Sequence, residues 1–396
     1  MKIGIEVSTI LNFGTRIGSG RYINNLIKNL LMIENNDDFK SIKSGNNSWD
    51  EYVFTGNYTT DENLHIFEDL INSFPKKKIS LNFNLISQRQ LEKAGQKKFP
   101  AIEMKGFKSD ILHCPDYIIP PTFNKNIVLT IHDMSFFRFP EFNFEWFVKK
   151  YQKMVAQNAK KAKFIIADSL STKNDIVKYL KTDPSKINVV HLASEDIFKI
   201  LDEDDIDIKV LQKYGINSNF ILSVGTIEPR KNFKTLIRAF DLLKKKYKFK
   251  NLKLVIAGKT GWKSEETFDI YNNSKNRENI IFTGEISDYD LVQLYNMASI
   301  FVYPSIFEGF GFPVLEAMSC GLPVIASNTS SIPEVLQHPD LLFNPFDEKE
   351  ICIKMDEILL NDNLNSYVRK QCLINSKKFS WSKTAAETLA VYRNCI

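Results

Sequence analysis

PSIFEGFGFPVLEAMSCGLP, residues 304–323, carries two glutamates, Glu308 and Glu316, separated by seven residues. Pro313 has the fixed φ favoured at the first position of a helix, and Gly321 can end that helix in a left-handed cap. We therefore expect a glycine-rich loop that holds Glu308, followed by a helix with Glu316 near its first turn.

This loop and helix predict a ligand site. Carboxylates can bind hydroxyl groups, and the free N–H groups of residues 310–312 can bind phosphate at the helix N-terminus. A glutamate that only balances the helix dipole would explain Glu316 but not the rest of the stretch.

Short apolar runs alternate with amphipathic helical stretches along the chain, a pattern typical of an α/β fold. Helices are expected at Tyr22–Met32 and Phe233–Lys246, among others. The expected strands are Ile3–Val7, Ile127–Ile131, Phe164–Ala167, Ile187–His191, Phe220–Val224, Leu252–Ala257, Ile280–Thr283, Ile300–Tyr303 and Pro323–Ser327.

The length of 396 residues predicts two or three domains. The acidic segment Leu201–Asp207 lacks strand character and is expected to be an interdomain linker. We thus predict an N-terminal domain over 1–200 and a C-terminal domain over 208–378.

Composition excludes several classes of protein. A net charge of +5 is too small for a dedicated nucleic-acid binder, and no apolar run is long enough to span a membrane. The five cysteines are scattered without a C-x-x-C pair, which argues against a disulfide framework or zinc site and favours the cytoplasm.

Residues 70–110 hold nine basic and three acidic side chains, with phenylalanines between them. This composition suits an anionic membrane surface, and a solvated lid or hairpin is an equally good interpretation.

The segment after the expected strand Phe220–Val224 begins with Gly225 and Thr226 and continues to the adjacent cations Arg230 and Lys231. Ligands of open α/β sheets bind at the carboxyl ends of the strands. Arginine and lysine there are suited to holding a diphosphate and neutralising a leaving phosphate. The alternative is two ordinary surface residues of a first helical turn, where cations are disfavoured.

The first turn after the N-terminal strand is also rich in glycine and includes Gly18 and Gly20. It matches neither the full dinucleotide fingerprint nor a P-loop. A backbone that approaches phosphate and a merely tight turn explain it equally well.

His132 and Asp133 directly follow an apolar strand, which places them at a sheet edge. A lone histidine at a strand end is more often structural, but this position favours a site residue. We expect His113 and His191 to be structural. The acidic run 202–207 contains D-x-D spacings, yet it lies in the expected linker, so we predict no metal.

These residues carry a resemblance. The C-terminal half resembles the family 4 retaining glycosyltransferases of the GT-B fold, whose hallmark is the E-x₇-E element of residues 308–316. Further matching elements in the family's order are Glu228–Asn232, Gly258, Phe282–Gly284, Leu291–Ala298, Pro333–Val335 and Phe379–Trp381. Residues 18–22 and 130–133 are similar to the mannosyltransferase-like branch of bacterial surface polysaccharide synthesis, whereas 36–110 match nothing.

The resemblance implies an α/β GT-B fold with two Rossmann-like domains facing across a cleft. The terminal helix of 379–396 would pack back on the first domain, which binds the acceptor. The implied catalytic residues are His132, Glu308, Arg230 and Lys231. The implied donor-binding residues are Gly18, Gly20, Gly225, Thr226, Gly309, Phe310, Gly311, Phe312 and Glu316. Many relatives carry arginine at the place of Thr226, so Arg230 and Lys231 must supply most of the positive charge.

Implied roles follow from these positions. Gly20 would meet the donor phosphate, His132 the donor sugar, and Glu308 the sugar hydroxyls. Glu316 would bind the nucleotide ribose, and Arg230 with Lys231 the diphosphate.

The implied reaction is metal-independent transfer of a hexose, with mannose from GDP-mannose the first choice, to a glycan or lipid-linked glycan. The enzyme would need no cofactor beyond its donor and would lie in the cytoplasm, at the inner face of the membrane. A GT-B sugar-nucleotide epimerase and a non-catalytic sugar-nucleotide-binding protein are the alternatives. The presence of both glutamates and both cations argues against a non-catalytic protein.

Overall fold

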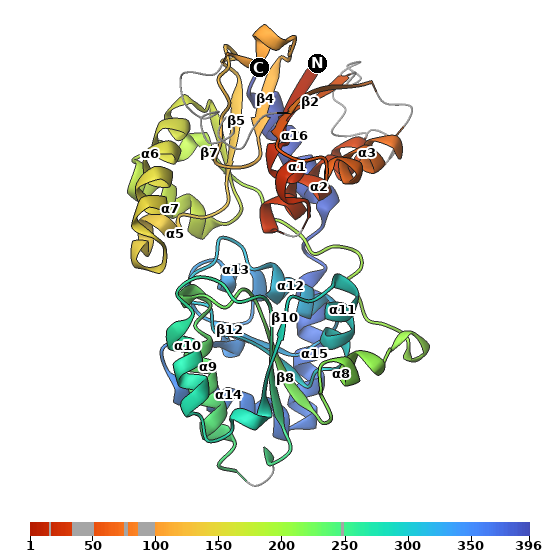
Figure 1. The fold of residues 1–396 in the computed structure, drawn as a ribbon, viewed down its shortest axis with the longest axis vertical. Helices are drawn as coiled ribbons and strands as arrows, with labels where there is room; N and C mark the ends of the chain where they lie inside the picture. Colours follow the sequence, from red (N-terminus) through yellow and green to blue (C-terminus); the bar gives the residue numbers. More distant parts are fainter. Residues whose placement is uncertain (16, 34–50, 75–77, 86–99, 247–248) are drawn as a thin grey trace. The chain divides into compact units, whose positions relative to one another are not determined.

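A computed structural model describes residues 1–15, 17–33, 51–74, 78–85, 100–246 and 249–396. The chain divides into two compact units, each built around one parallel β-sheet with helices packed against it (Figure 1). The first unit comprises Met1–Arg138, Trp146–Leu192 and Ser380–Ile396, and the second comprises Phe139–Glu145 and Ala193–Phe379. The predicted α/β class with two Rossmann-like domains is confirmed.

The sheet of the first unit has the strand order β3-β2-β1-β4-β5-β6-β7, and all pairs are parallel. Its strands are β1 (Lys2–Glu6), β2 (Glu51–Tyr58), β3 (Ile79–Leu85), β4 (Ile111–Cys114), β5 (Ile127–Ile131), β6 (Phe164–Ala167) and β7 (Ile187–Val189). The helices of this unit are α1 (Ser8–Phe13), α2 (Gly18–Ile33), α3 (Leu64–Asn72), α5 (Ser135–Arg138), α6 (Glu145–Lys161), α7 (Leu170–Leu180) and α16 (Trp381–Asn394).

The sheet of the second unit has the order β10-β9-β8-β11-β12-β13, again parallel throughout. Its strands are β8 (Phe220–Val224), β9 (Lys253–Ala257), β10 (Ile280–Gly284), β11 (Ile300–Tyr303), β12 (Val324–Ser327) and β13 (Leu342–Phe343). The helices of this unit are α8 (Lys209–Lys213), α9 (Phe233–Leu243), α10 (Glu265–Asn273), α11 (Asp288–Met297), α12 (Phe312–Ser319), α13 (Ile332–Leu336), α14 (Glu348–Leu360) and α15 (Asp362–Ser376).

The central strands are continuous apolar runs because helices cover both faces of each sheet. Every residue of β4, β5, β8 and β11 is buried. A polar chain inside the first core is fully paired: the Thr130 hydroxyl contacts Tyr22 Oη at 3.1 Å and His113 Nε2 at 2.9 Å. The C-terminal helix joins this chain, because Tyr392 Oη lies 2.6 Å from His113 Nδ1. His113 is thus a structural residue, as predicted.

Strand order also marks where each sheet can bind a ligand. In the first sheet the order reverses between β1 and β4, and in the second between β8 and β11. Loops that leave neighbouring strands at such a switch point run in opposite directions and open a crevice at the carboxyl edge.

The units differ from the predicted domains at two places. The boundary falls after Leu192, so the acidic segment predicted as a linker belongs to the second unit. It is held there by Gln293, which accepts from the Asp207 N–H and donates to the Asp205 carbonyl, each at 2.9 Å. Residues 139–145, assigned by sequence to the first domain, also belong to the second unit. The Trp262 indole donates to the Phe142 carbonyl at 2.8 Å and secures this segment.

Candidate active site

The candidate site of the second unit begins at a close approach between two backbones. β8 is followed by Gly225 and β9 by Gly258, with φ of 153° and 148°. A Cβ on Gly258 would lie 2.1 Å from the Gly225 carbonyl oxygen, so only glycine fits. This contact fixes the direction in which Thr226 and the following residues leave the sheet.

Arg230 and Lys231 follow in a 3₁₀ turn, Pro229–Lys231, which ends at Asn232 with φ of 56°. α9 starts only at Phe233, so the two cations precede the helix and do not occupy its first turn. The alternative interpretation, two ordinary surface residues of a first helical turn, therefore does not hold. Both cations pair instead with Glu308, which lies in the loop after β11, the neighbouring strand across the switch point.

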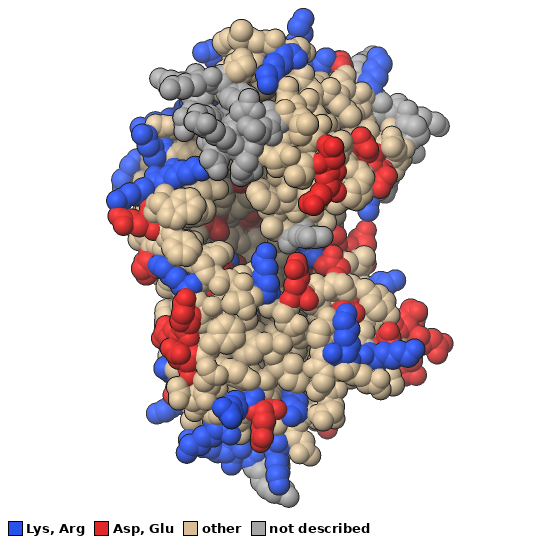
Figure 2. Space-filling view, in the orientation of Figure 1, with Lys and Arg blue, Asp and Glu red and all other residues tan. Residues whose placement is uncertain are grey.

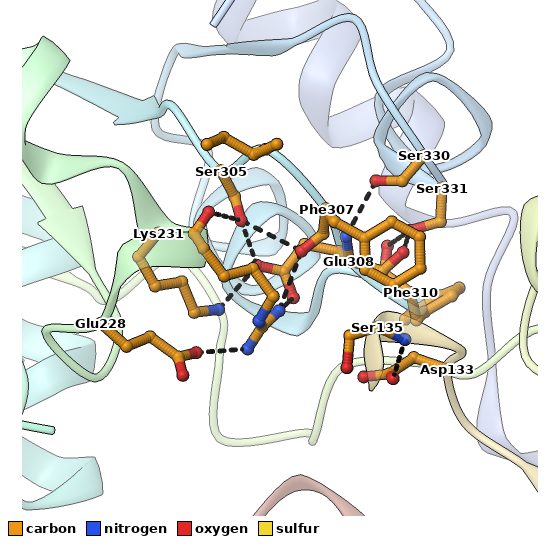
Figure 3. A network of polar contacts seen from close by, with 12 residues as sticks. Asp133, Ser135, Glu228, Lys231, Ser305, Phe307, Glu308, Phe310, Ser330 and Ser331 are labelled. Carbon is orange, nitrogen blue, oxygen red and sulfur yellow. Dashed lines mark hydrogen bonds and ion pairs between the residues drawn. The ribbon is translucent and has the colours of Figure 1, made fainter. Parts of the chain in front are cut away.

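Glu308 lies in the loop after β11, and both of its carboxylate oxygens are occupied (Figure 3). Oε1 accepts from Lys231 Nζ at 2.7 Å and from the hydroxyls of Tyr303 at 2.8 Å and Ser305 at 2.6 Å. Oε2 accepts from Arg230 Nη1 at 2.5 Å. Arg230 in turn donates to Glu228 at 2.7 Å and to the Phe307 carbonyl at 2.9 Å. The side chain predicted to bind sugar hydroxyls is therefore the counterion of both predicted diphosphate ligands.

This network is buried yet charged. Glu308 is 7% exposed and Lys231 8%. Burial alone would raise the pKa of Glu308, but the charges of Arg230 and Lys231 and the hydrogen bonds of Lys231 and Ser305 lower that pKa to about 2. Burial lowers the pKa of Lys231, against the attraction of Glu308. The pair stays ionised at neutral pH because each charge stabilises the other.

The loop that holds Glu308 is fixed from outside as well. The Glu308 N–H donates to the Ser330 hydroxyl at 2.9 Å (Figure 3). The Ser331 hydroxyl donates to the Glu308 carbonyl at 3.0 Å and to the Phe310 carbonyl at 2.7 Å. Gly309 lies within this loop, and Gly311, with φ of 115°, precedes α12.

Helix α12 follows the prediction closely. It starts at Phe312 with Pro313 in its first turn, and Gly321 adopts a left-handed φ of 66° just after its end. Glu316 is its fifth residue, just after the first turn, and is only 3% exposed. The Tyr295 hydroxyl donates to Glu316 Oε2 at 3.0 Å.

In the first unit, His132 follows β5 at the carboxyl edge. Its Nδ1 lies 2.7 Å from Asp168 Oδ2 and its Nε2 lies 3.0 Å from the Pro115 carbonyl oxygen. Burial alone would lower the pKa of His132, but the charge and hydrogen bond of Asp168, with help from Asp116 and the Pro115 carbonyl, raise it to about 9. Both ring nitrogens lie within hydrogen-bond distance of oxygen acceptors, an arrangement that favours the protonated form of His132.

The glycine-rich turn differs from its predicted form because α1 intervenes between β1 and Gly14. Gly18 is the first residue of α2, and a Cβ on Gly20 would lie 1.9 Å from the Gly14 carbonyl oxygen. Close packing of α2 on this turn is sufficient reason for the glycine at position 20.

Sequence reasoning missed four partners: Tyr303, Ser305, Asp168 and Glu6. Asp168 follows the apolar strand β6 as His132 follows β5, so the same signal could have found it. Glu6 ends β1 and is 5% exposed, and its Oε1 accepts from the Ser8 N–H at 3.0 Å. Burial raises its pKa to about 7. Within the described residues, no three metal-ligating side chains gather in one place.

Solved structures with this fold include WaaG, a glycosyltransferase involved in lipopolysaccharide biosynthesis, with 15% identity, a TM-score of 0.67 and coverage of 99% of this chain and 98% of that one. Another is Anabaena HepE in complex with UDP and glucose, with 17% identity and a TM-score of 0.69. The match covers 98% of this chain and 99% of that one. The two units thus form a GT-B glycosyltransferase fold.

The family model "Glycosyl transferases group 1" matches residues 207–373. O-antigen chain mannosyltransferase B of Escherichia coli is 31% identical over 291 residues, 73% of this chain and 76% of that protein. RfbU of Salmonella typhimurium, another O-antigen chain mannosyltransferase, is 30% identical over 64% of this chain and 68% of its own. The chain matches only 28% of the length of the E. coli mannosyltransferase WbdA, at 36% identity. The chain belongs to the group 1 glycosyltransferases, and the resemblance to family 4 mannosyltransferases is confirmed.

Proposed function

We propose that this glycosyltransferase moves mannose from GDP-mannose to a growing, lipid-linked glycan of a bacterial surface polysaccharide, with retention of anomeric configuration. The observation that carries the proposal is the 31% identity to O-antigen chain mannosyltransferase B across three quarters of both chains. A more distant relative, from Campylobacter jejuni and 26% identical over 62% of this chain, carries diphospho-undecaprenol in its substrate name and supports the lipid-linked acceptor.

The network of the second unit suits a donor diphosphate. Arg230 and Lys231 are held in place by Glu308, so they need no reorganisation when a phosphate arrives. The Arg230 side chain keeps 19% of its surface exposed and is the group that a ligand can reach. The N-terminus of α12 adds partial positive charge. These groups can stabilise the leaving diphosphate without a metal.

Retention follows from front-face attack in this proposal. The bond from the sugar C1 to the phosphate oxygen breaks as the bond from C1 to the acceptor oxygen forms on the same face. The acceptor proton passes to the leaving phosphate oxygen, so the reaction needs no protein base. His132 fits this scheme, because both of its ring nitrogens are already hydrogen-bonded and the residue holds the edge of its sheet instead.

We propose a location in the cytoplasm, at the inner face of the membrane. No helix in the described ranges is long and apolar enough to cross a bilayer. Most lysines and arginines of the basic segment 70–110 lie outside the described residues, so that part of the prediction stays a prediction.

The test is nucleotide release from a panel of GDP-, UDP-, ADP- and dTDP-sugars, with magnesium or with EDTA. We expect slow release of GDP from GDP-mannose in both media, and faster release with a lipid-linked acceptor. Release abolished by EDTA would contradict the metal-free scheme. An isomerised sugar nucleotide without free GDP would favour the epimerase, and binding without turnover would favour a non-catalytic protein.

A further inference from the structure

The connection between β4 and β5 lacks a helix. Parallel neighbours are usually joined through an α-helix that covers the sheet. Here residues 115–126 return from the carboxyl edge to the start of β5 without one. A groove of about 1240 Å³ remains between this connection and α6.

The walls of the groove are fixed by hydrogen bonds. Asn158 of α6 donates to the Tyr117 carbonyl at 2.8 Å, where the connection begins. Further along, the Ile102 N–H donates to the Pro121 carbonyl at 2.9 Å, and Glu103 accepts from the hydroxyl of Thr122 and the N–H of Asn124. The groove is therefore preformed.

The floor of the groove is apolar. Ile119, Pro120 and Ile127 line it from the connection and β5, and Met154 lines it from α6. Two large apolar side chains at the rim are open to solvent: Met104 is 70% exposed and Phe123 is 67% exposed. Exposed apolar side chains around a hollow mark a binding surface.

The rim is strongly basic. Five lysines line the groove, and no aspartate or glutamate is among the described lining residues: Lys125, Lys150, Lys153, Lys160 and Lys161. None of the five forms an ion pair within the described part of the chain. Lys and Arg side chains gather on the side of the first unit where α6 and α7 lie (Figure 2). Unpaired cations above an apolar floor complement an anion that carries an apolar chain.

We propose that this groove binds the lipid phosphate of the acceptor, with the apolar chain along Ile119, Phe123 and Met154 and the phosphate or diphosphate at the lysines. The connection that lines the groove leaves the carboxyl edge of the first sheet after Cys114 and reaches the amino end of β5 at Ile127, so a glycan attached to the phosphate can extend along it toward the carboxyl edge. This inference rests on the proposed lipid-linked acceptor and names the surface that recognises its anchor.

Direct binding tests the inference without requiring turnover. The probes are farnesyl diphosphate, farnesol and inorganic diphosphate, each titrated into the intact protein. We expect farnesyl diphosphate to bind at least about tenfold more tightly than either part alone, because chain and charge are held together. The double variant K150E/K153E should weaken its binding by about tenfold or more, through repulsion in place of attraction. F123S should weaken it by about fivefold through lost apolar contact.

The matched control is K108E/K186E, which makes the same change in charge at exposed lysines outside the groove. It should bind farnesyl diphosphate as the unaltered protein does. All substituted side chains are exposed, so folding is preserved. Equal binding by K150E/K153E and the control would overturn the inference. Loss of binding to anionic phospholipid vesicles, with farnesyl diphosphate binding intact, would also overturn it and assign the surface to the bilayer.

Measurements of enzyme activity distinguish this inference from the proposed function. K150E/K153E should raise KM for a lipid-linked acceptor about tenfold while leaving GDP release without acceptor unchanged. If no donor is turned over, the proposed function fails, but the farnesyl diphosphate titration still decides the groove.

Discussion

The carboxyl edges of the two sheets differ in how their acidic side chains are paired with cations. At the second edge, two cations and two carboxylates form one connected network: Arg230, Lys231, Glu228 and Glu308. At the first edge, four acidic residues lie at or just after the ends of neighbouring strands: Glu6, Asp116, Asp133 and Asp168. His132 forms an ion pair with Asp168. The charges at the second edge are thus balanced within one network, whereas acidic residues outnumber cations in the set at the first edge.

The two edges also differ in what offsets the cost of burying a charged glutamate. Glu308 keeps a low pKa because cations surround it, although it is buried. Glu6 is equally buried, but its only described hydrogen-bond donor is Ser8, and its pKa rises to about 7. The pKa of a buried glutamate is therefore lowered at the second edge, where cations surround it, and raised at the first, where its described donor is a neutral serine.

The largest effect is expected at Lys231. Lys231→Ala leaves Glu308 buried with one cation fewer, which should cost about 3–5 kcal/mol of unfolding free energy. Donor turnover should fall by about two to three decades with loss of a preorganised charge. Lys234→Ala is the control, because Lys234 pairs with Glu266 at 2.7 Å on the surface. It should cost at most about 1 kcal/mol. Denaturant unfolding and nucleotide release would measure both, and equal effects of the two variants would contradict the assignment.

A backbone change should affect the second edge nearly as much. Gly258→Ala forces a Cβ against the Gly225 carbonyl, and we expect a loss of about 3 kcal/mol or more because backbone cannot move aside. Gly284, in the same sheet, has a φ of 71° and open space where a Cβ would lie, so Gly284→Ala should cost only about 1 kcal/mol. Thermal unfolding of the pair checks this, and the reverse order would disprove the close approach.

At the first edge, Glu6→Gln should change the pH dependence of stability. The native state binds the Glu6 proton more tightly than the unfolded state, since its pKa is about 7 against 4.5. Stability is therefore lost as pH rises from 4.5 to 7, by up to about 3 kcal/mol. The glutamine variant should lack this loss. Urea titrations across that range would reveal it, and parallel curves for both proteins would exclude a raised pKa.

The smallest effect is a titration shift. His132 should stay protonated up to a pH of about 9, because Asp168 holds the charge. Asp168→Asn should bring that pKa down by about two or more units, since burial then acts unopposed. Histidine NMR resonances measure both proteins. His113 is the internal control, as burial lowers its pKa to about 3 and its signal should not move at neutral pH. A His132 midpoint near 6.5 would refute the ion pair.

The directions of these pKa shifts also determine how stability changes at high and at low pH. The raised pKa of His132 contributes stability that is present at pH 6.5 and is lost as pH rises through about 9. The Glu308 network contributes above pH 4.5 and is lost as pH falls toward about 2.

Local signals predicted most of the fold. Buried parallel strands such as β5, β6, β8 and β11 have the predicted bounds because their apolar runs are continuous. β2 and β3 were missed, since their sequences mix polar and apolar residues. β4 was missed as well, because it has only four residues and includes His113. β13, with two residues, is too short to carry a pattern.

The sequence singled out Glu308, Arg230 and Lys231 but did not predict that they contact one another. The E-x₇-E spacing and the adjacent cations were visible in sequence, yet the contact of Glu308 with Arg230 and Lys231 depends on β8 and β11 being neighbours. Strand order is a long-range property that no local pattern carries.

The central claim is that the second edge holds the donor diphosphate, and calorimetric titration with GDP tests it most directly. Arg230→Ala should weaken GDP binding by at least about tenfold, because a charge-assisted contact to phosphate is lost. Glu6→Gln, a change at the first edge, should leave GDP binding within about twofold, as no phosphate ligand is altered. Unchanged affinity in Arg230→Ala, with a loss in Glu6→Gln, would contradict the account.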